Sequence, residues 1–258
     1  MFAEEFASVL TAGKKKVHLL STNLPGYFVS AMLAGIYVGL GIILIFTVGG
    51  LLSAEGSPWA KTAMGVSFGI ALSLVIIAGS ELFTGNVFVM SAGLLKRSVS
   101  ISKALWLLLI SYLGNLAGSV LLAAVYFLTG LSTGPVGEFI AKVSAAKMGL
   151  PAGQLFFRGL LCNLLVCLAV WSSFRCKEEI AKLVMVFWCL FAFITSGFEH
   201  SIANMTLLAI ALFNPLGQAV SLAGYGYNLL WVTLGNIVGA AVFLAIPYFM
   251  ISLEKKEA

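Results

Sequence analysis

The sequence contains no aspartate, two histidines and few charged residues, which together make up 10% of its 258 positions. The absence of aspartate removes the carboxylate that most hydrolytic, phosphoryl-transfer and magnesium-dependent sites use. Two histidines, His18 and His200, are too few for an ordinary transition-metal site. The four cysteines form no C-x-x-C pair and have the pattern of buried apolar residues. We therefore predict no catalytic residue, no bound metal and no cofactor.

Apolar side chains, by contrast, are abundant. They account for 60% of the residues, and the mean hydropathy is +1.05. A soluble core of this length needs much less apolar surface, so we predict a polytopic membrane protein with a single transmembrane domain over 1–258. The first residues include Glu4 and Glu5 without a basic region, so no signal peptide is expected.

Six apolar runs are long enough to cross a bilayer, which takes about 20 helical residues. They lie at about 27–52, 62–95, 104–130, 153–174, 181–212 and 228–252. The second and the fifth run are too long for one straight crossing, and polar residues interrupt each of them. The sequence therefore predicts an all-α fold with six transmembrane helices, of which the second and the fifth are broken.

Basic residues are divided unequally between the segments that connect these spans. One side of the membrane receives eleven of them, namely Lys14, Lys15, Lys16, Lys96, Arg97, Lys103, Arg175, Lys177, Lys182, Lys255 and Lys256. The other side receives Lys61, Lys142 and Lys147, with Arg158 just inside the fourth span. The positive-inside rule then predicts that both termini are cytoplasmic. The net charge of +5 reflects this topology, and we expect no nucleic-acid partner.

Two segments outside the spans have an expected structure of their own. Residues 1–24 mix apolar side chains with Glu, Lys and Thr, which is typical of an amphipathic helix on the cytoplasmic membrane face or against a neighbouring subunit. Residues 131–150 are only partly apolar and contain Pro135, so an external loop with a short helix is expected there.

The two interruptions resemble each other. Gly79–Asn86 reads GSELFTGN and Gly197–Asn204 reads GFEHSIAN, so each contains Gly-x-Glu, and the two lie 118 residues apart. A glutamate at membrane depth is costly, and glycines with polar neighbours there indicate unwound helix. Paired broken helices in corresponding positions of two halves point to a transport site.

A second pair of segments supports a duplication. Leu113–Gly118 reads LGNLAG and Leu234–Gly239 reads LGNIVG, with an offset of 121 residues. Two half-repeats, at 25–130 and 151–258, would each contain three spans, and an odd number of spans makes the repeat an inverted one with its site near the midplane. The Gly-Asn-x-x-Gly pattern itself predicts close helix packing, with hydrogen bonds from the asparagine.

The polar residues in the breaks allow two interpretations. Glu81 and Glu199 can accept hydrogen bonds from the backbone N–H groups that a broken helix leaves without partners, or they can contact the transported species. Asn86 and Asn204 can both donate and accept. The predicted anchors of the broken helices are Gly79, Glu81, Gly85 and Gly197.

His200 is the predicted pore residue, because it lies inside a break that has a counterpart in the other half. It could donate a hydrogen bond to an anion or exchange a proton with it. Thr84 offers a hydroxyl in the other break, with capping of the backbone as the alternative. Lys147 could lend positive potential to an outer vestibule, or it is simply a loop lysine. Apolar constrictions are expected at Leu82, Phe83, Phe68 and Phe193, although packing and lipid contact are alternatives for such residues.

Four stretches resemble the formate/nitrite transporter family over nearly the whole chain. They are Ala34–Gly41 (AGIYVGLG), Ala78–Gly85 (AGSELFTG), Gly159–Cys167 (GLLCNLLVC) and Gly197–Met205 (GFEHSIANM). Within the family, Phe157–Asn163 and Asn228–Asn236 look most similar to the bacterial nitrite channels.

The resemblance implies an aquaporin-like protomer in a homopentamer, with one pore per protomer, in the cytoplasmic (inner) membrane of a bacterium. It implies that Thr84 and His200 form the central polar pair and that Leu82 belongs to the cytoplasmic constriction. Phe68 and Phe193 would form the periplasmic constriction. The residues that would surround and polarise the histidine are Glu199, Asn163 and Lys147.

The expected function is passage of a small monovalent anion, with nitrite as the first candidate and formate or hydrosulfide as alternatives. Transport could be coupled to protons if His200 protonates the anion; the rival is a channel that keeps the ion charged and partly hydrated. A neutral-solute pore would normally contain paired Asn-Pro-Ala loops, and this chain has only Asn214-Pro215-Leu216. The lone pore histidine and the lack of aspartate argue against an enzyme.

Overall fold

The computed structural model describes residues 1–253, which form helices and no strand. Six helical segments are long and apolar enough to cross a membrane: Leu24–Ala54 (α2), Ala60–Gly79 (α3, α4 and η1), Ile101–Leu128 (α6), Ala152–Arg175 (α8), Glu179–Ser196 (α9) and Leu222–Ser252 (α11, η2 and α12). Two shorter apolar helices, Phe83–Leu95 (α5) and Ser201–Phe213 (α10), follow the second and the fifth span. The predicted fold class is therefore confirmed, including the two broken helices.

Irregular turns divide some of these spans further. The second consists of α3 (Ala60–Ser67), α4 (Gly69–Ser73) and a π-helical turn, η1 (Leu74–Gly79). The last consists of α11 (Leu222–Ala240), a π-helical turn η2 (Ala241–Ala245) and α12 (Ile246–Ser252). The residues between the spans and their short partners, 80–82 and 197–200, are the two breaks.

A glycine ends the long piece of each broken helix. Gly79 has φ +80° and Gly197 has φ +78°, in the left-handed region where a side chain would be strained. Gly197 is the C-terminal cap of α9, and its N–H donates to the carbonyls at the end of that helix. The glycines recognised in the sequence therefore stand where the chain must leave the helical path.

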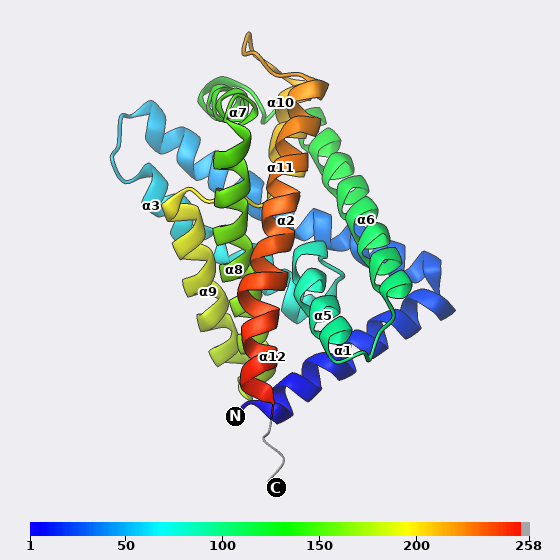
Figure 1. Ribbon diagram of the computed structural model, residues 1–258. Helices are drawn as coiled ribbons and strands as arrows, with labels where there is room; N and C mark the ends of the chain where they lie inside the picture. Colours follow the sequence, from blue (N-terminus) through cyan, green and yellow to red (C-terminus); the bar gives the residue numbers. More distant parts are fainter. Residues whose placement is uncertain (254–258) are drawn as a thin grey trace, which may run out of the picture.

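The two terminal helices, α1 (Ala3–Thr22) and α12, reach one end of the molecule and α7 (Gly134–Met148) lies at the other (Figure 1). The short helix α5 lies toward the α1 end, whereas α10 lies toward the α7 end (Figure 1). Each short helix thus completes the crossing that its long partner begins. This arrangement is the one expected for an inverted repeat, because the two breaks face the middle from opposite ends.

The repeated Gly-Asn-x-x-Gly segments pack helices tightly in both halves. Gly118 of α6 lies against α2, and a Cβ there would overlap the Met32 carbonyl. Gly239 of α11 lies against α8, and a Cβ there would overlap the Leu160 carbonyl. The close packing predicted from the pattern is therefore confirmed in both halves.

Helices also cover the two ends of the molecule. The N-terminal helix α1 runs across the end opposite α7 and buries Phe6 and Val9 (Figure 1). At the other end, the segment 131–150 is more helical than expected, because Pro135 starts a helix of 15 residues, α7.

Not all of the basic residues behind the predicted orientation belong to the part of the chain that the structure describes. The lysines of the N-terminal segment and of the segments between the spans do, whereas Lys255 and Lys256 lie outside the described residues.

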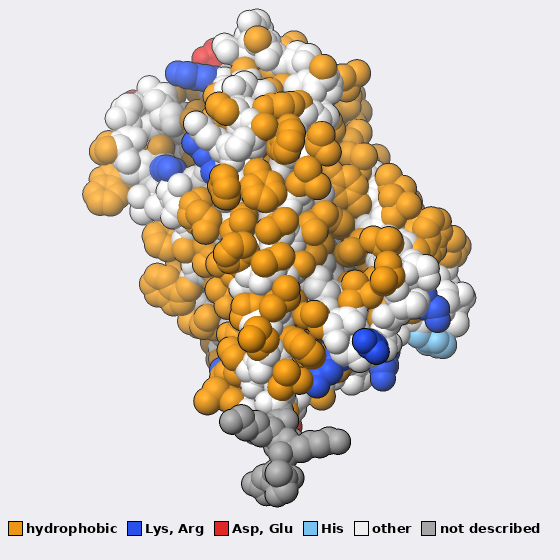
Figure 2. Space-filling model, in the orientation of Figure 1, with side chains coloured by type: hydrophobic (Ala, Val, Ile, Leu, Met, Phe, Trp, Pro, Cys, Tyr) orange, Lys and Arg blue, Asp and Glu red, His pale blue; other side chains and the backbone are white. Residues whose placement is uncertain are grey.

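On the face seen in Figure 2, apolar side chains cover the middle, and lysines and arginines lie toward the two ends. Large apolar residues on the spanning helices are well exposed, among them Leu105, Val125, Trp188, Leu230 and Phe243. An exposed apolar belt between charged ends is what a lipid-facing surface requires. The surface and the six apolar spans are therefore those of a membrane protein.

Candidate functional site

An asparagine from the third span holds the first break. Asn115 Oδ1 accepts a hydrogen bond from the Phe83 N–H at 2.9 Å. Its Nδ2 donates to the carbonyls of Glu81 at 2.9 Å and of Ala31 at 2.7 Å. A single buried side chain thus satisfies a donor and an acceptor of the broken backbone and ties both to α2.

The sixth span repeats this arrangement at the second break. Asn236 Oδ1 accepts from the Ser201 N–H at 2.9 Å, and its Nδ2 donates to the carbonyls of Glu199 at 3.1 Å and of Gly159 at 2.7 Å. The sequence predicted close packing and hydrogen bonds across the helices for these two asparagines, without connecting them to the breaks. They are also the groups that satisfy the broken backbone, and the repeated Gly-Asn pair was the signal that could have found them.

The sequence offered backbone N–H groups as one set of partners for the carboxylate of Glu81. In the structure, side chains bind it instead. It accepts from Lys16 Nζ at 2.7 Å, from Asn86 Nδ2 at 2.9 Å and from the Tyr27 hydroxyl at 3.2 Å. Ser111 in turn contacts both Tyr27 and Asn86. Lys16 comes from α1, so the N-terminal helix supplies the counter-ion of the first break.

The carboxylate of Glu199 is bound in a similar way by other elements. Lys147 Nζ lies 2.7 Å from both carboxylate oxygens, and Asn204 Nδ2 donates to one of them at 2.7 Å. Asn204 also donates to Asn228 Oδ1, and Asn228 donates to the Lys147 carbonyl. Lys147 therefore belongs to a partly buried ion pair, and its charge is largely balanced by Glu199.

His200 caps α10 and contacts the other break. Its Nδ1 accepts a hydrogen bond from the Ala203 N–H at 3.1 Å, so Nδ1 carries no proton. The proton of the neutral ring then sits on Nε2, which lies 3.0 Å from Thr84 Oγ1. Both side chains are buried. The structure thus brings together the two residues that the sequence pairs across the halves, and His200 presents an N–H donor to Thr84.

Three cavities follow one another through shared lining residues, and His200 lines two of them. An outer cavity at the α7 end encloses about 470 Å³ and an inner cavity at the other end about 340 Å³. A small void of about 10 Å³ lies between them; it shares Phe193 and His200 with the outer cavity and Leu72 and Leu82 with the inner one. The chain therefore has two larger cavities on either side of a narrow void that His200 lines.

The predicted constriction residues differ in their positions relative to these cavities. Phe68, Phe193 and Leu82 line the small void, and the Phe68 and Phe193 rings meet edge to face with centroids 5.5 Å apart. Phe83 lines none of the three cavities and packs against Tyr112 instead. Neighbouring positions at the start of α5 point in different directions, which sequence spacing alone does not resolve.

Asn163 is buried, and its side-chain hydrogen bonds do not include one to the His200 ring. Its Nδ2 donates to the Thr84 carbonyl at 3.3 Å and to the Asn236 carbonyl at 2.8 Å. It thus links the first turn of α5 to the sixth span, whose Asn236 side chain binds the second break. Among residues 1–253, no group of three His, Cys or Glu side chains is placed to hold a metal ion.

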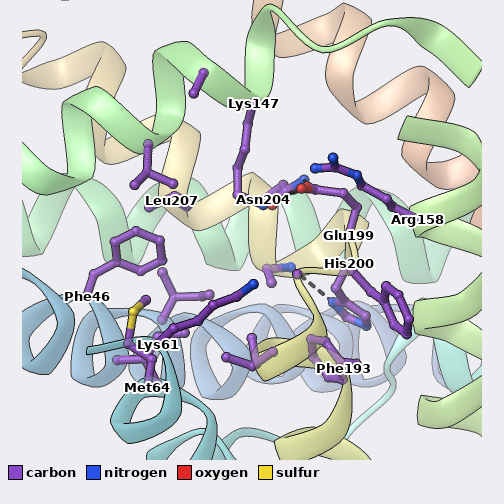
Figure 3. A pocket seen from close by; sticks show the side chains of 18 of the residues that line it. Phe46, Lys61, Met64, Lys147, Arg158, Phe193, Glu199, His200, Asn204 and Leu207 are labelled. Carbon is purple, nitrogen blue, oxygen red and sulfur yellow. Dashed lines mark hydrogen bonds and ion pairs between the residues drawn. The ribbon is translucent and has the colours of Figure 1, made fainter. Parts of the chain in front are cut away.

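The outer cavity contains two further cations that the sequence did not single out as site residues. Lys61 reaches into it from α3 and Arg158 from α8, while Lys147 approaches from α7 (Figure 3). Figure 3 also shows Glu199, His200 and Phe193 at the side of the cavity nearest the break. Lys61 and Arg158 appeared in the sequence only as outer basic residues, because their distance from the breaks along the chain hides their proximity in space.

Comparison with known proteins agrees with these features. Residues 3–250 match the family model described as formate/nitrite transporter. The nitrite transporter NirC of Escherichia coli K12 is 50% identical over 240 residues, which cover 92% of this chain and 88% of that protein.

Two solved structures extend the comparison to the fold. An FNT family ion channel superposes with a TM-score of 0.92 at 44% identity and covers 97% of this chain and 99% of its own. A pentameric formate channel with formate bound superposes with a TM-score of 0.77 at 30% identity, covering 95% and 99%. These relatives are transporters and channels, not enzymes. This protein belongs to the formate/nitrite transporter family.

Proposed function

We propose that this protein conducts small monovalent anions, with nitrite as its principal substrate. One observation carries the proposal: two water-accessible cavities meet at a narrow apolar void where the buried His200 presents a hydrogen-bond donor. The 50% identity to a nitrite transporter supports nitrite. Formate is the alternative, because a formate channel shares the fold at 30% identity; hydrosulfide has similar size and charge.

The size of the void limits what can pass. A volume of about 10 Å³ holds roughly one water molecule, so an ion must lose most of its hydration shell between Phe68 and Phe193. A strongly hydrated cation would lose more hydration energy there than a weakly hydrated monovalent anion. Apolar walls therefore favour small ions of low charge density.

The two short helices offset part of the cost of placing an anion at the midplane. Both α5 and α10 begin at the breaks, so their N-termini and the positive ends of their dipoles point toward the middle of the protein. The Nε2–H of His200 can exchange its contact with Thr84 for one with an anion oxygen. We infer that Thr84 holds the donor in place when no ion is present.

The hydrogen bonds of His200 favour donation by a neutral ring over direct proton transfer. Protonation at Nδ1 would require loss of the hydrogen bond from the Ala203 N–H, which caps α10. Release of the Nε2 proton without that step would leave an imidazolate. In this proposal, nitrite passes as an ion that is hydrogen-bonded to neutral His200, and any coupling to protons acts through water in the cavities.

We further propose that the protein forms a homopentamer, with one such path in each protomer, in a bacterial cytoplasmic membrane. The similarity to a pentameric formate channel supports the assembly. The lysines of α1 and of the segments at the same end support cytoplasmic termini, which makes the α7 end periplasmic.

Nitrite entry into proteoliposomes tests the proposal. Purified protein should accelerate nitrite uptake well above that of protein-free liposomes, with formate and hydrosulfide as competitors. The ion mechanism predicts that uptake follows the membrane potential, and that an imposed proton gradient at zero potential has little effect. Uptake that requires the proton gradient would instead support protonation of the anion, and uptake equal to that of protein-free liposomes would contradict the proposed function.

A further inference from the structure

The outer cavity has more positive charge than its ion pair accounts for. Its charged lining residues are Lys61, Lys147, Arg158 and Glu199. Lys147 and Glu199 neutralise each other through the 2.7 Å pair. Two positive charges remain, on Lys61 and Arg158. The same count for the inner cavity leaves none, because Lys16 and Glu81 are its only charged lining residues and they form a pair.

Neither of the two remaining cations is paired with a carboxylate among residues 1–253. Lys61 Nζ lies beside the second break, 3.2 Å from the position that a Cβ on Gly197 would occupy. Arg158 makes one long side-chain contact, from Nη2 to Gln154 Oε1 at 3.4 Å, and its own carbonyl accepts from the Glu199 N–H. Both cationic groups are therefore available to an anion that enters the cavity.

The rest of the outer cavity is mainly apolar. Its walls include Ile42, Ile45, Phe46, Met64, Phe139 and Leu207. A volume of about 470 Å³ is within the range of small-molecule binding sites and is far larger than a triatomic ion needs. Apolar walls with a few convergent charged groups are the usual composition of such a site.

The floor of the cavity prevents a larger molecule from moving on. The edge-to-face contact of Phe68 and Phe193 lies below it, and the void beyond encloses about 10 Å³. A hydrocarbon tail that fills the outer cavity cannot enter this void. A molecule with an anionic head and a short tail would therefore be retained in the position where a small anion passes.

We propose that the outer cavity is a binding site for monovalent anions with a short apolar tail, such as short-chain carboxylates and alkanesulfonates. Lys61 and Arg158 bind the head and the apolar walls bind the tail, so these anions block the passage of small ions from the α7 side. The inference rests on the proposed conduction of nitrite. It adds a class of blocking ligand, and it adds that these ligands act only from the α7 side; conduction alone requires neither.

Hexanesulfonate is a suitable probe, because it stays ionised and does not cross the bilayer as a neutral acid. Nitrite flux is measured in right-side-out and in inverted membrane vesicles that contain the full-length protein, with the probe added outside. Block is expected in right-side-out vesicles only. Pentanesulfonate should block less strongly than hexanesulfonate and butanesulfonate less strongly again, because each added methylene should strengthen the block by about fourfold. Hexanol, which has the tail without the charge, should leave the flux unchanged.

Two variants and a matched control test the assigned residues. Lys61→Gln and Arg158→Gln should each raise the half-blocking concentration by about tenfold, because each removes a charged partner of the head group. Lys142→Gln removes the same charge from an exposed position of α7 outside the cavity, and its half-blocking concentration should match that of the unaltered protein.

The outcomes separate this inference from the proposed function. Absence of nitrite flux in the unaltered protein would contradict conduction itself. Normal flux without block, block from both faces or from the inverted face alone, or equal potency along the sulfonate series would each overturn the blocking site. The same conclusion would follow if Lys142→Gln weakened the block as much as Arg158→Gln, because the charge effect would then be diffuse.

Discussion

The two breaks are held by equivalent hydrogen bonds but differ in the side chain at their centre. Asn115 and Asn236 make equivalent hydrogen bonds to the two backbones, and Glu81 and Glu199 each bind a lysine and an asparagine. At the equivalent position 118 residues apart, however, the first break has Leu82 and the second has His200. The duplication therefore provides two similar supports, and the departure from symmetry places one apolar constriction and one hydrogen-bond donor at the centre.

The charges around the two breaks depart from symmetry in another way. The lysines that pair with the glutamates come from α1 and α7, which lie outside the repeated spans. The outer cavity then retains two positive charges and the inner one none. Features that hold the broken helices are thus shared between halves, whereas features that attract or select an ion are not. The following predictions test this division.

The largest expected effect is on stability, and it should be similar in both halves. Asn115→Ala and Asn236→Ala each remove three buried hydrogen bonds and leave backbone groups of a break without partners. We expect each to lower the free energy of unfolding by about 4 kcal/mol. Thermal unfolding of the detergent-solubilised protein measures this. A loss for only one of the two would show that the breaks are not anchored in the same way.

The ion pairs should differ in strength between the halves. Glu199 is 3% exposed and bound by Lys147 through both oxygens, whereas Glu81 is 11% exposed and bound through one. Lys147→Gln should therefore cost about 3 kcal/mol, and Lys16→Gln about half of that. The double variant Lys147→Gln with Glu199→Gln removes the unpaired charge and should recover most of the loss in the same unfolding experiment. Equal losses for the two lysines would contradict the difference in burial.

Replacing the central side chain of the second break by that of the first tests the role of His200 as a hydrogen-bond donor. His200→Leu gives the second break the side chain of the first and should reduce nitrite flux by about a hundredfold, because a hydrogen bond to a charged group is lost. His200→Asn retains a donor and should lose less. Leu82→Ala, which widens the inner side of the void without touching the donor, serves as the comparison. Flux in His200→Leu equal to that of the unaltered protein would remove the histidine from the mechanism.

A smaller effect is expected from widening the outer constriction. Phe193→Ala should admit larger anions, so the ratio of acetate to nitrite flux should rise severalfold, since the apolar wall of the void would recede. Phe83→Ala is the matched control, because Phe83 lies outside the path, and it should leave the ratio unchanged. A larger change in Phe83→Ala than in Phe193→Ala would show that the conduction path runs elsewhere.

Much of this architecture could be predicted from the sequence, because membrane depth makes polar residues informative. Apolar runs located the spans, and Gly-x-Glu located both breaks to within a few residues. Contacts between residues far apart in the chain were harder to predict from the sequence. Nothing in it connects Lys16 with Glu81 or Lys61 with Gly197, because these contacts depend on how α1 and α3 pack. The direction of Phe83 was likewise hidden, because one residue of difference at a helix start changes which side of the helix a side chain occupies.

Comparative solute flux tests the central claim most directly. Proteoliposomes with the unaltered protein are exposed to nitrite, formate, glycerol and potassium ions at equal osmolarity, and entry is followed by light scattering. We predict rapid entry of nitrite, slower entry of formate, and rates for glycerol and potassium that match protein-free liposomes. Glycerol entry as fast as that of nitrite would contradict an anion path past His200 and would identify a neutral-solute pore instead.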